Sequence, residues 1–195
     1  MENKHPILYF VTGNIHKFNE VSKLFQQHSV NFHLKHCEMN AIEIQADTNK
    51  EVVIGKLNAV KNKIDGSFFV EDAGFYVDEP LNGFPGVYSS YVFKTIGNQG
   101  ILKLIDDFKN SRAHFSAIFA LYFKPHDKIY IFEGKVYGTV SKDIRGDKGF
   151  GFDPIFIPHD KPDKTFAELT MEEKNRLSHR AKALTKLIEF LEAVK

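Results

Sequence analysis

The chain has 195 residues, of which 26 are basic and 25 acidic, so its formal net charge is +1. Its length predicts one domain, and 43% hydrophobic with 26% charged residues is typical of a globular protein. The single cysteine excludes a disulfide framework and a cysteine-based zinc site. The balanced charge argues against a protein that coats nucleic acid, yet it leaves room for a small anionic ligand.

No targeting or membrane segment is expected. The apolar run at residues 7–11 is shorter than the core of a signal peptide, and no run approaches the roughly 20 residues that cross a bilayer. We therefore expect a cytoplasmic protein with no membrane partner, in which Cys37 is a reduced thiol.

The first half of the chain predicts alternating strands and helices. The apolar run at 7–11 predicts a buried strand, which Thr12-Gly13-Asn14 ends before a helix begins. A second strand is expected at 31–36, and Thr48 is expected to cap a helix that ends at Gly66. The apolar stripe of that helix is Val53, Leu57, Val60 and Ile64.

The second half predicts strands, loops and a helical C-terminus. The run at 68–70 predicts a buried strand that ends at Glu71 and Asp72, and the Pro- and Gly-rich stretch at 80–86 predicts a loop. The remaining expected elements are a helix around 101–105, antiparallel strands at 115–123 and 129–136, a Gly-rich loop at 145–154, and helices that begin at Thr170 and Ser178. Together they predict an α/β fold around a mixed sheet.

The turn Thr12-Gly13-Asn14 is the first candidate site. It joins a strand to a helix with Lys17 in its first turn, and the free N–H groups of a helix start suit an anion. A lysine there opposes the helix dipole, which points to a phosphate ligand. A tight turn with a solvated lysine is the alternative. The chain has no Walker A motif.

Glu71 and Asp72 form the second candidate site. Adjacent strand residues point to opposite faces, so one carboxylate is expected to bind a metal while the other supports it. Oxygen ligands favour Mg²⁺. Two solvated acids before a turn are the alternative.

Basic residues also open the last helix. His179 and Arg180 follow Ser178, and Lys174 lies four residues before Ser178. Arginine can chelate a phosphate or a carbonyl edge, so this segment again predicts a phosphate-bearing ligand. Surface-exposed helix starts of this composition are the alternative.

The loop Gly149-Phe150-Gly151-Phe152-Asp153-Pro154 sets aromatic rings between glycines. Its phenylalanines are expected to stack on a nucleobase, and Asp153 to read an N–H edge of that base. Tucking of the rings into the core is the alternative. Glu43, between two isoleucines, and Lys56, beside an apolar helical stripe, complete the charged candidates.

Five motifs in order resemble the inosine triphosphate pyrophosphatase family, also called the non-standard purine NTP pyrophosphatases. They are Thr12-Gly13-Asn14-x-x-Lys17, Val70-Glu71-Asp72-Ala73-Gly74, Gly83-Phe84-Pro85-Gly86-Val87-Tyr88-Ser89, Phe150-Gly151-Phe152-Asp153-Pro154 and Glu173-Lys174-Asn175-x-x-Ser178-His179-Arg180. They span nearly the whole chain.

The resemblance implies Mg²⁺-dependent hydrolysis of ITP, dITP and XTP to the monophosphate and pyrophosphate. It implies one domain over 1–195, with an elongated mixed sheet flanked by helices and two lobes with the active-site cleft between them. It also implies a homodimer whose small-molecule partner is a nucleoside triphosphate.

The resemblance also implies roles for individual residues. Asp72 would activate water, Glu71 would support that centre, and Glu43 with Asp72 would hold Mg²⁺. Ala73 stands in the substrate site where many relatives have Ser or Thr. The residues implied to hold the triphosphate are Thr12, Gly13, Asn14, Lys17, Lys56, Lys174 and Arg180. Those implied to enclose the base are Phe150, Gly151, Phe152, Asp153, His179 and Arg180.

Selectivity is expected to follow from the 6-keto group of hypoxanthine and xanthine. A donor such as Arg180 or His179 aimed at that oxygen would be left unpaired by adenine, which disfavours ATP. The alternatives are a related house-cleaning pyrophosphatase for modified pyrimidine or methylated nucleotides, and a non-catalytic nucleotide sensor.

Overall fold

The computed structural model describes residues 5–39, 41–106, 108 and 111–194. The chain divides into two compact units. Unit 1 comprises residues 1–72, 117–134 and 180–195, and unit 2 comprises residues 73–116 and 135–179. Each unit is built from separate stretches of sequence.

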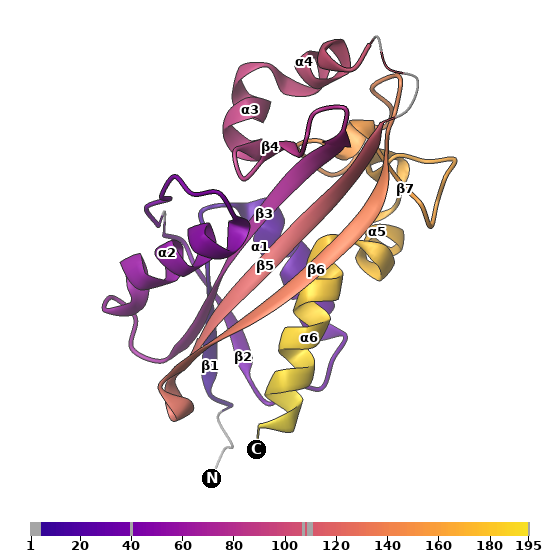
Figure 1. Cartoon of the computed structure of the whole chain (residues 1–195). Helices are drawn as coiled ribbons and strands as arrows, with labels where there is room; N and C mark the ends of the chain where they lie inside the picture. The colour runs from indigo at the N-terminus through magenta and orange to yellow at the C-terminus, as the bar shows by residue number, and fades with distance from the viewer. Residues whose placement is uncertain (1–4, 40, 107, 109–110, 195) are drawn as a thin grey trace. The chain divides into compact units, whose positions relative to one another are not determined.

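The strands form a mixed sheet in the order β2-β1-β3-β5-β6-β7, with β4 paired to β3 (Figure 1). β1 runs parallel to β2 and β3, whereas β4 is antiparallel to β3 and β7 to β6. This arrangement confirms the predicted α/β fold. The strands are β1 (Ile7–Val11), β2 (His33–Cys37), β3 (Ser67–Glu79), β4 (Phe84–Gly86), β5 (Arg112–Phe123), β6 (Lys128–Val140) and β7 (Phe156–Pro158).

Of the α-helices in the described ranges, all but α3 lie close to predicted positions, and α3 was not predicted. They are α1 (Ile15–Gln26), α2 (Asn49–Lys61), α3 (Ser89–Thr95), α4 (Gly97–Leu104), α5 (Met171–Leu177) and α6 (His179–Ala193). Short 3-10 helices lie at Lys124–His126, Asp153–Ile155 and Phe166–Glu168. Capping boxes at Thr48 and Thr170 confirm two predicted helix starts. α2 ends at Lys61, before Gly66, and Ile64 packs on the core from beyond the helix. None of the helices in these ranges has both the length and the apolar character that crossing a bilayer requires.

The third strand differs from its prediction. β3 continues through Glu71 and Asp72 to Glu79, and both acids are buried within it. The prediction that the strand ends at these acids is therefore wrong. Buried charges are stable only when paired, and their partners come from segments distant in sequence. The predicted loop at 80–86 also contains β4, which pairs with β3 through Phe84, Pro85 and Gly86.

In unit 1, helices cover both faces of the sheet. Phe10, Phe69 and Phe119 pack together on the face that also contacts Phe18 of α1. Phe68 and Val70 belong to a second core cluster, which holds the α2 stripe of Val53, Leu57 and Val60. Alternation along β3 therefore sends odd-numbered side chains toward α1 and even-numbered ones toward α2.

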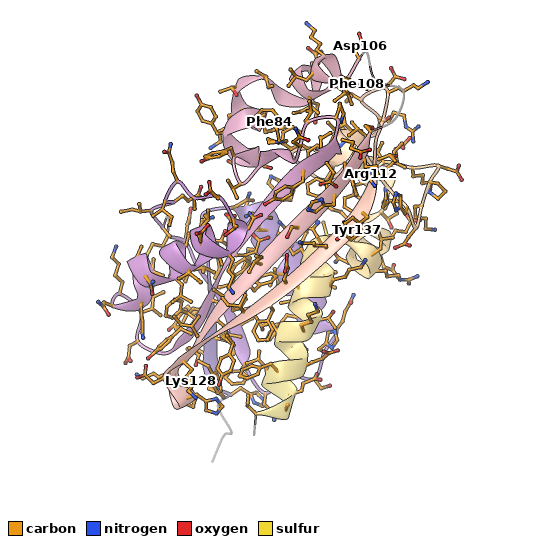
Figure 2. The ribbon with its side chains drawn as sticks, viewed as in Figure 1. Phe84, Asp106, Phe108, Arg112, Lys128 and Tyr137 are labelled. Carbon is orange, nitrogen blue, oxygen red and sulfur yellow. The ribbon has the colours of Figure 1, made fainter. Side chains whose placement is uncertain are left out.

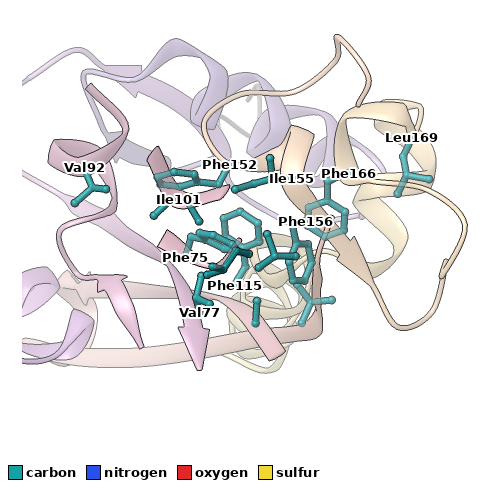
Figure 3. Close-up of a cluster of buried hydrophobic side chains, with 14 of the residues drawn as sticks. Phe75, Val77, Val92, Ile101, Phe115, Phe152, Ile155, Phe156, Phe166 and Leu169 are labelled. Atoms are coloured by element: carbon teal, nitrogen blue, oxygen red, sulfur yellow. The ribbon is translucent and has the colours of Figure 1, made fainter. Parts of the chain in front are cut away.

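Unit 2 has its own aromatic core. Phe75, Phe115 and Phe156 contact one another with ring centroids 4.9–6.1 Å apart, and Phe166 packs beside them (Figure 3). Aromatic pairs at such separations add to the stabilisation from burial. The exposed side chains of Arg112 in β5 and Tyr137 in β6 are labelled in Figure 2.

Candidate functional site

The turn between β1 and α1 is ordered by its own polar side chains. Thr12 Oγ1 accepts a hydrogen bond from Asn14 N (3.1 Å), and Asn14 Oδ1 accepts from His16 N (3.0 Å) and Lys17 N (3.3 Å). Asn14 is thus the N-cap of α1. Gly13 is exposed at the tip of this turn, and Lys17 lies in the first helical turn as predicted.

A buried ion cluster in unit 1 joins α1, β3 and α6. Glu71 Oε1 accepts from Arg180 Nε (3.1 Å) and Nη2 (2.9 Å), while Glu71 Oε2 lies 2.5 Å from Lys17 Nζ. Arg180 Nη1 donates to Glu20 Oε2 (2.5 Å). Arg180 is 1% exposed, and its guanidinium contacts Glu71 of β3 and Glu20 of α1, so it joins three elements of the fold.

Opposite charges control the ionisation of this cluster. Burial would raise the pKa of Glu71, but Arg180 and Lys17 outweigh it and lower that pKa to about 2. Burial likewise opposes the charge of Arg180, yet Glu71 and Glu20 raise its pKa above the ordinary value. Glu71 and Arg180 are therefore both charged at neutral pH.

Asp72 belongs to a second cluster in unit 1, on the α2 side of β3. Lys56 Nζ lies 2.6 Å from Asp72 Oδ1 and 2.8 Å from Glu43 Oε1, and Asn49 Nδ2 donates to Asp72 Oδ2. Burial opposes the charge of Lys56, but Asp72 and Glu43 prevail and raise its pKa. One ammonium thus joins the two carboxylates that the family resemblance implied as metal ligands.

The carboxylate oxygens of Glu43 and Asp72 are of the ligand type that a hard divalent cation prefers, and Lys56 Nζ lies within 3 Å of one oxygen of each. Glu71 is not beside them: its carboxylate binds Lys17 and Arg180 on the other face of β3. Among the described residues, no group of three His, Cys, Asp or Glu side chains forms a metal site. A site there would be completed by water and phosphate oxygens.

Unit 2 holds the predicted base-binding loop. Asp153 is 2% exposed, and its Oδ2 accepts from Lys174 Nζ (2.7 Å) and from Phe150 N (2.8 Å). Lys174 Nζ also lies 5.1 Å from the ring centroid of Phe150. This Oδ2 therefore orders the loop, and the ammonium of Lys174 pairs with it.

Phe152 does not face a ligand, and this corrects the sequence prediction. Its ring is 3% exposed, stacks on Phe75 at 5.0 Å and meets the edge of Phe93 at 5.4 Å. Phe152 therefore packs in the core, which is the alternative stated above, because burial of a Phe ring is more favourable in free energy than its exposure to water. Phe150 is half-buried and stays the candidate for stacking on a base.

Three other predicted residues occupy distinct environments. His179 is 3% exposed and its ring stacks on Phe115 at 4.7 Å. Ala73 is half-buried in β3. Gly151 has φ +64°, and a Cβ there would meet nothing within 4 Å, so its backbone angle, rather than crowding, favours glycine.

Sequence reasoning missed two buried polar residues of these clusters. Glu20 lies three residues after Lys17, among the buried α1 residues Val21 and Leu24, and binds Arg180. Asn49 is the first residue of α2 and binds Asp72. For Glu20 the available sequence signal was a carboxylate inside an apolar helical stripe. For Asn49 the sequence offered no signal beyond its position directly after the helix cap.

The chain thus has an α/β fold around a mixed sheet, and unit 1 holds two clusters in which cationic side chains pair with carboxylates. Residues 8–190 match the model of the Ham1 family, and the chain belongs to that family. A "dITP/XTP pyrophosphatase" of Thermococcus kodakarensis is 47% identical over 94% of this chain and 96% of its own. One of Pyrococcus horikoshii is 44% identical over the same shares. Both relatives are thus named for pyrophosphatase activity on dITP and XTP.

Solved structures agree with this assignment. The Ham1 protein of Staphylococcus aureus superposes with a TM-score of 0.78 at 29% identity, over 97% of this chain and all of that one. The HAM1 protein of Coxiella burnetii gives 0.82 at 26% identity, over 96% and 98%. These comparisons confirm the family that the five motifs indicated.

Proposed function

We propose that this protein is a Mg²⁺-dependent pyrophosphatase that converts dITP, ITP and XTP to the monophosphate and pyrophosphate. The observation that carries the proposal is the 47% identity, over nearly the full length of both chains, to an enzyme named a dITP/XTP pyrophosphatase. The buried ammonium and carboxylate groups of unit 1 support it. Such an activity would remove deaminated purines from the nucleotide pool.

In this proposal Asp72 deprotonates or orients the attacking water. Asn49 donates to one oxygen of Asp72 and Lys56 to the other, so the carboxylate is held in one orientation. Glu43 and Asp72 would hold Mg²⁺, which supplies neutralisation of phosphate charge and a more acidic water. The side chain of Lys17 and the helix start beside it are proposed to attract phosphate oxygens.

The ion pairs of Arg180 favour a positioning role for this residue over direct contact with the substrate. Arg180 Nε, Nη1 and Nη2 all donate to Glu71 or Glu20, so we assign Arg180 to fixing Glu71 rather than to a direct contact with triphosphate or base. His179 remains the proposed donor to the 6-keto oxygen, and Phe150 the proposed stacking ring. Glu71, in turn, is proposed to orient Lys17.

A substrate panel tests this function. The protein is incubated with ITP, XTP, GTP and ATP with and without Mg²⁺, and pyrophosphate and orthophosphate are measured separately. We expect pyrophosphate from ITP and XTP at specificity constants at least 100-fold above those for ATP, and no turnover after EDTA treatment. Equal constants for ATP and ITP, or release of orthophosphate alone, contradict the proposal. Preference for a modified pyrimidine or methylated nucleotide would assign the alternative pyrophosphatase.

The proposal includes a homodimer in the cytoplasm. The free, half-buried thiol of Cys37 fits a reducing compartment. Sedimentation velocity of the purified protein tests the dimer, and a single monomer boundary at micromolar concentration would contradict it.

A further inference from the structure

His36 is the last but one residue of β2, and its side chain reaches the turn that follows β1. The ring atom Nε2 lies 2.8 Å from the carbonyl oxygen of Thr12. The ring also stacks on Phe18 of α1, with centroids 4.4 Å apart and planes 21° from parallel. Two independent contacts therefore hold the imidazole between β2, the turn and α1.

The contact between His36 and Thr12 lies directly after the last residue pair of the β1–β2 ladder. The parallel register of β1 and β2 ends with Val11 opposite Cys37. One residue further on, Thr12 N donates to Cys37 O (3.1 Å), and Thr12 O meets the side chain of His36. Both peptide groups of Thr12 are thus fixed by the end of β2, one through backbone and the other through a side chain.

The hydrogen bond to the carbonyl oxygen of Thr12 requires a proton on one particular ring nitrogen of His36. A carbonyl oxygen only accepts hydrogen bonds, so Nε2 carries the proton. The neutral Nε2–H tautomer and the imidazolium both satisfy this requirement, which means that the bond persists in either charge state. A side chain of similar length without a donor would leave the carbonyl oxygen of Thr12 without this partner.

We propose that His36 is a positioning residue for the anion-binding turn of residues 12–14. By holding the carbonyl of Thr12 it fixes the peptide planes that precede Asn14 and the start of α1, which present N–H groups to phosphate. This inference rests on the proposed function, because it assumes that the turn binds the triphosphate. Neither the motifs nor the proposed roles above include His36.

The expected defect is in binding rather than in chemistry. An interaction that holds phosphate equally in the ground state and the transition state changes KM while kcat stays the same. Loss of one hydrogen bond of this kind predicts a rise in KM for ITP of about threefold to tenfold. The Kd of inorganic triphosphate, which lacks the base and sugar, should rise by a similar factor.

Matched variants distinguish the effect of the N–H donor of His36 from the effect of its stacked ring. His36→Gln keeps an N–H donor, and His36→Met has nearly the same length without one, while both remove the stacking on Phe18. His33→Met, at an exposed position of the same strand, is the control. KM and kcat are measured with ITP, and the Kd of inorganic triphosphate by calorimetry. We expect wild-type values for His33→Met, a raised KM for His36→Met, and recovery of most of that loss in His36→Gln.

Equal KM and Kd values in folded His36→Gln and His36→Met would overturn the inference. If His36→Met is unfolded, His36→Phe replaces it, because it keeps a ring against Phe18 and removes the donor, with the same two outcomes. A defect in kcat alone also overturns it. Failure of the wild-type protein to cleave ITP would instead contradict the proposed function, and the Kd of inorganic triphosphate still tests His36 in that case.

Discussion

Glu71 and Asp72 are adjacent in the sequence, yet their carboxylates enter different clusters. Glu71 binds Lys17 and Arg180, whereas Asp72 binds Lys56 and Asn49. The reason is the alternation of side chains along β3. Asp72, beside the second carboxylate of Glu43 across one ammonium, is therefore the better candidate for catalysis, and Glu71 for positioning.

Replacement of Asp72 by Asn tests that division. Asp72→Asn removes the negative charge but keeps the size of the side chain, so we expect kcat for ITP to fall at least 100-fold. The Kd of ITP should change less than about threefold. Asp78→Asn, also in β3 and bound to His114, is the control and should retain kcat. Near-normal turnover in Asp72→Asn would contradict the assigned role.

Ionisation of Glu71 makes the stability of the fold depend on pH. In the folded state the pKa of Glu71 is lowered from its ordinary value of 4.5 to about 2. Its ionised carboxylate therefore stabilises the folded state fully above pH 4.5 and progressively less as the pH falls toward 2. The contribution is about 3 kcal/mol. Urea unfolding at pH 7, 4.5 and 3 should show this decline.

The matched variant for this effect is Glu172→Gln, which removes an exposed pair with Arg176. Its stability should follow that of the wild type at each pH within about 0.5 kcal/mol. Glu71→Gln should be less stable at pH 7 and flatter between pH 4.5 and 3. If Glu71→Gln loses as much stability between pH 4.5 and 3 as the wild type does, Glu71 is not the source of that loss.

At the scale of elements, helix starts were predictable and the extent of β3 was not. Thr48 and Thr170 act through local hydrogen bonds to residues three positions away, which a sequence shows directly. β3 reads as two apolar stretches separated by Glu71 and Asp72. Its continuity depends on Lys17, Lys56 and Arg180, which are remote in sequence.

The cap of α2 offers a test at this scale. Thr48→Ala removes the acceptor of Glu51 N and the hydroxyl bond to Glu51 Oε2, so the free energy of unfolding should fall by about 1 kcal/mol. Because α2 carries Asn49 and Lys56, the KM for ITP should also change in Thr48→Ala. Thr95→Ala, whose hydroxyl bonds back to Tyr91 and Val92 in α3, should cost less than half as much. Equal losses in the two variants would contradict the capping argument.

At the scale of the molecule, the backbone passes between the units at residues 72–73, 116–117, 134–135 and 179–180. β3, β5 and β6 each contribute residues to both units. We therefore propose that residues 1–195 form one cooperative domain, because separation of the units would divide three strands.

Calorimetry checks this proposal. We expect a single thermal transition whose calorimetric and van't Hoff enthalpies agree. Tyrosine fluorescence and far-ultraviolet circular dichroism should give the same midpoint. Two resolved transitions would show that the units unfold independently and would contradict the single-domain prediction.

The sequence by itself determined the α/β class, the capped helix starts at Thr48 and Thr170, and the family, because local periodicity, caps and five ordered motifs are properties of short segments. The tertiary structure decided which charges meet. It paired Arg180 with Glu71 and Glu20, and it moved Phe152 from the predicted base pocket to the core. The physical reason is that burial makes an unpaired charge or an exposed ring costly, and only the folded chain shows which side chains are buried together. The net charge of +1 contained no sign of these internal pairs.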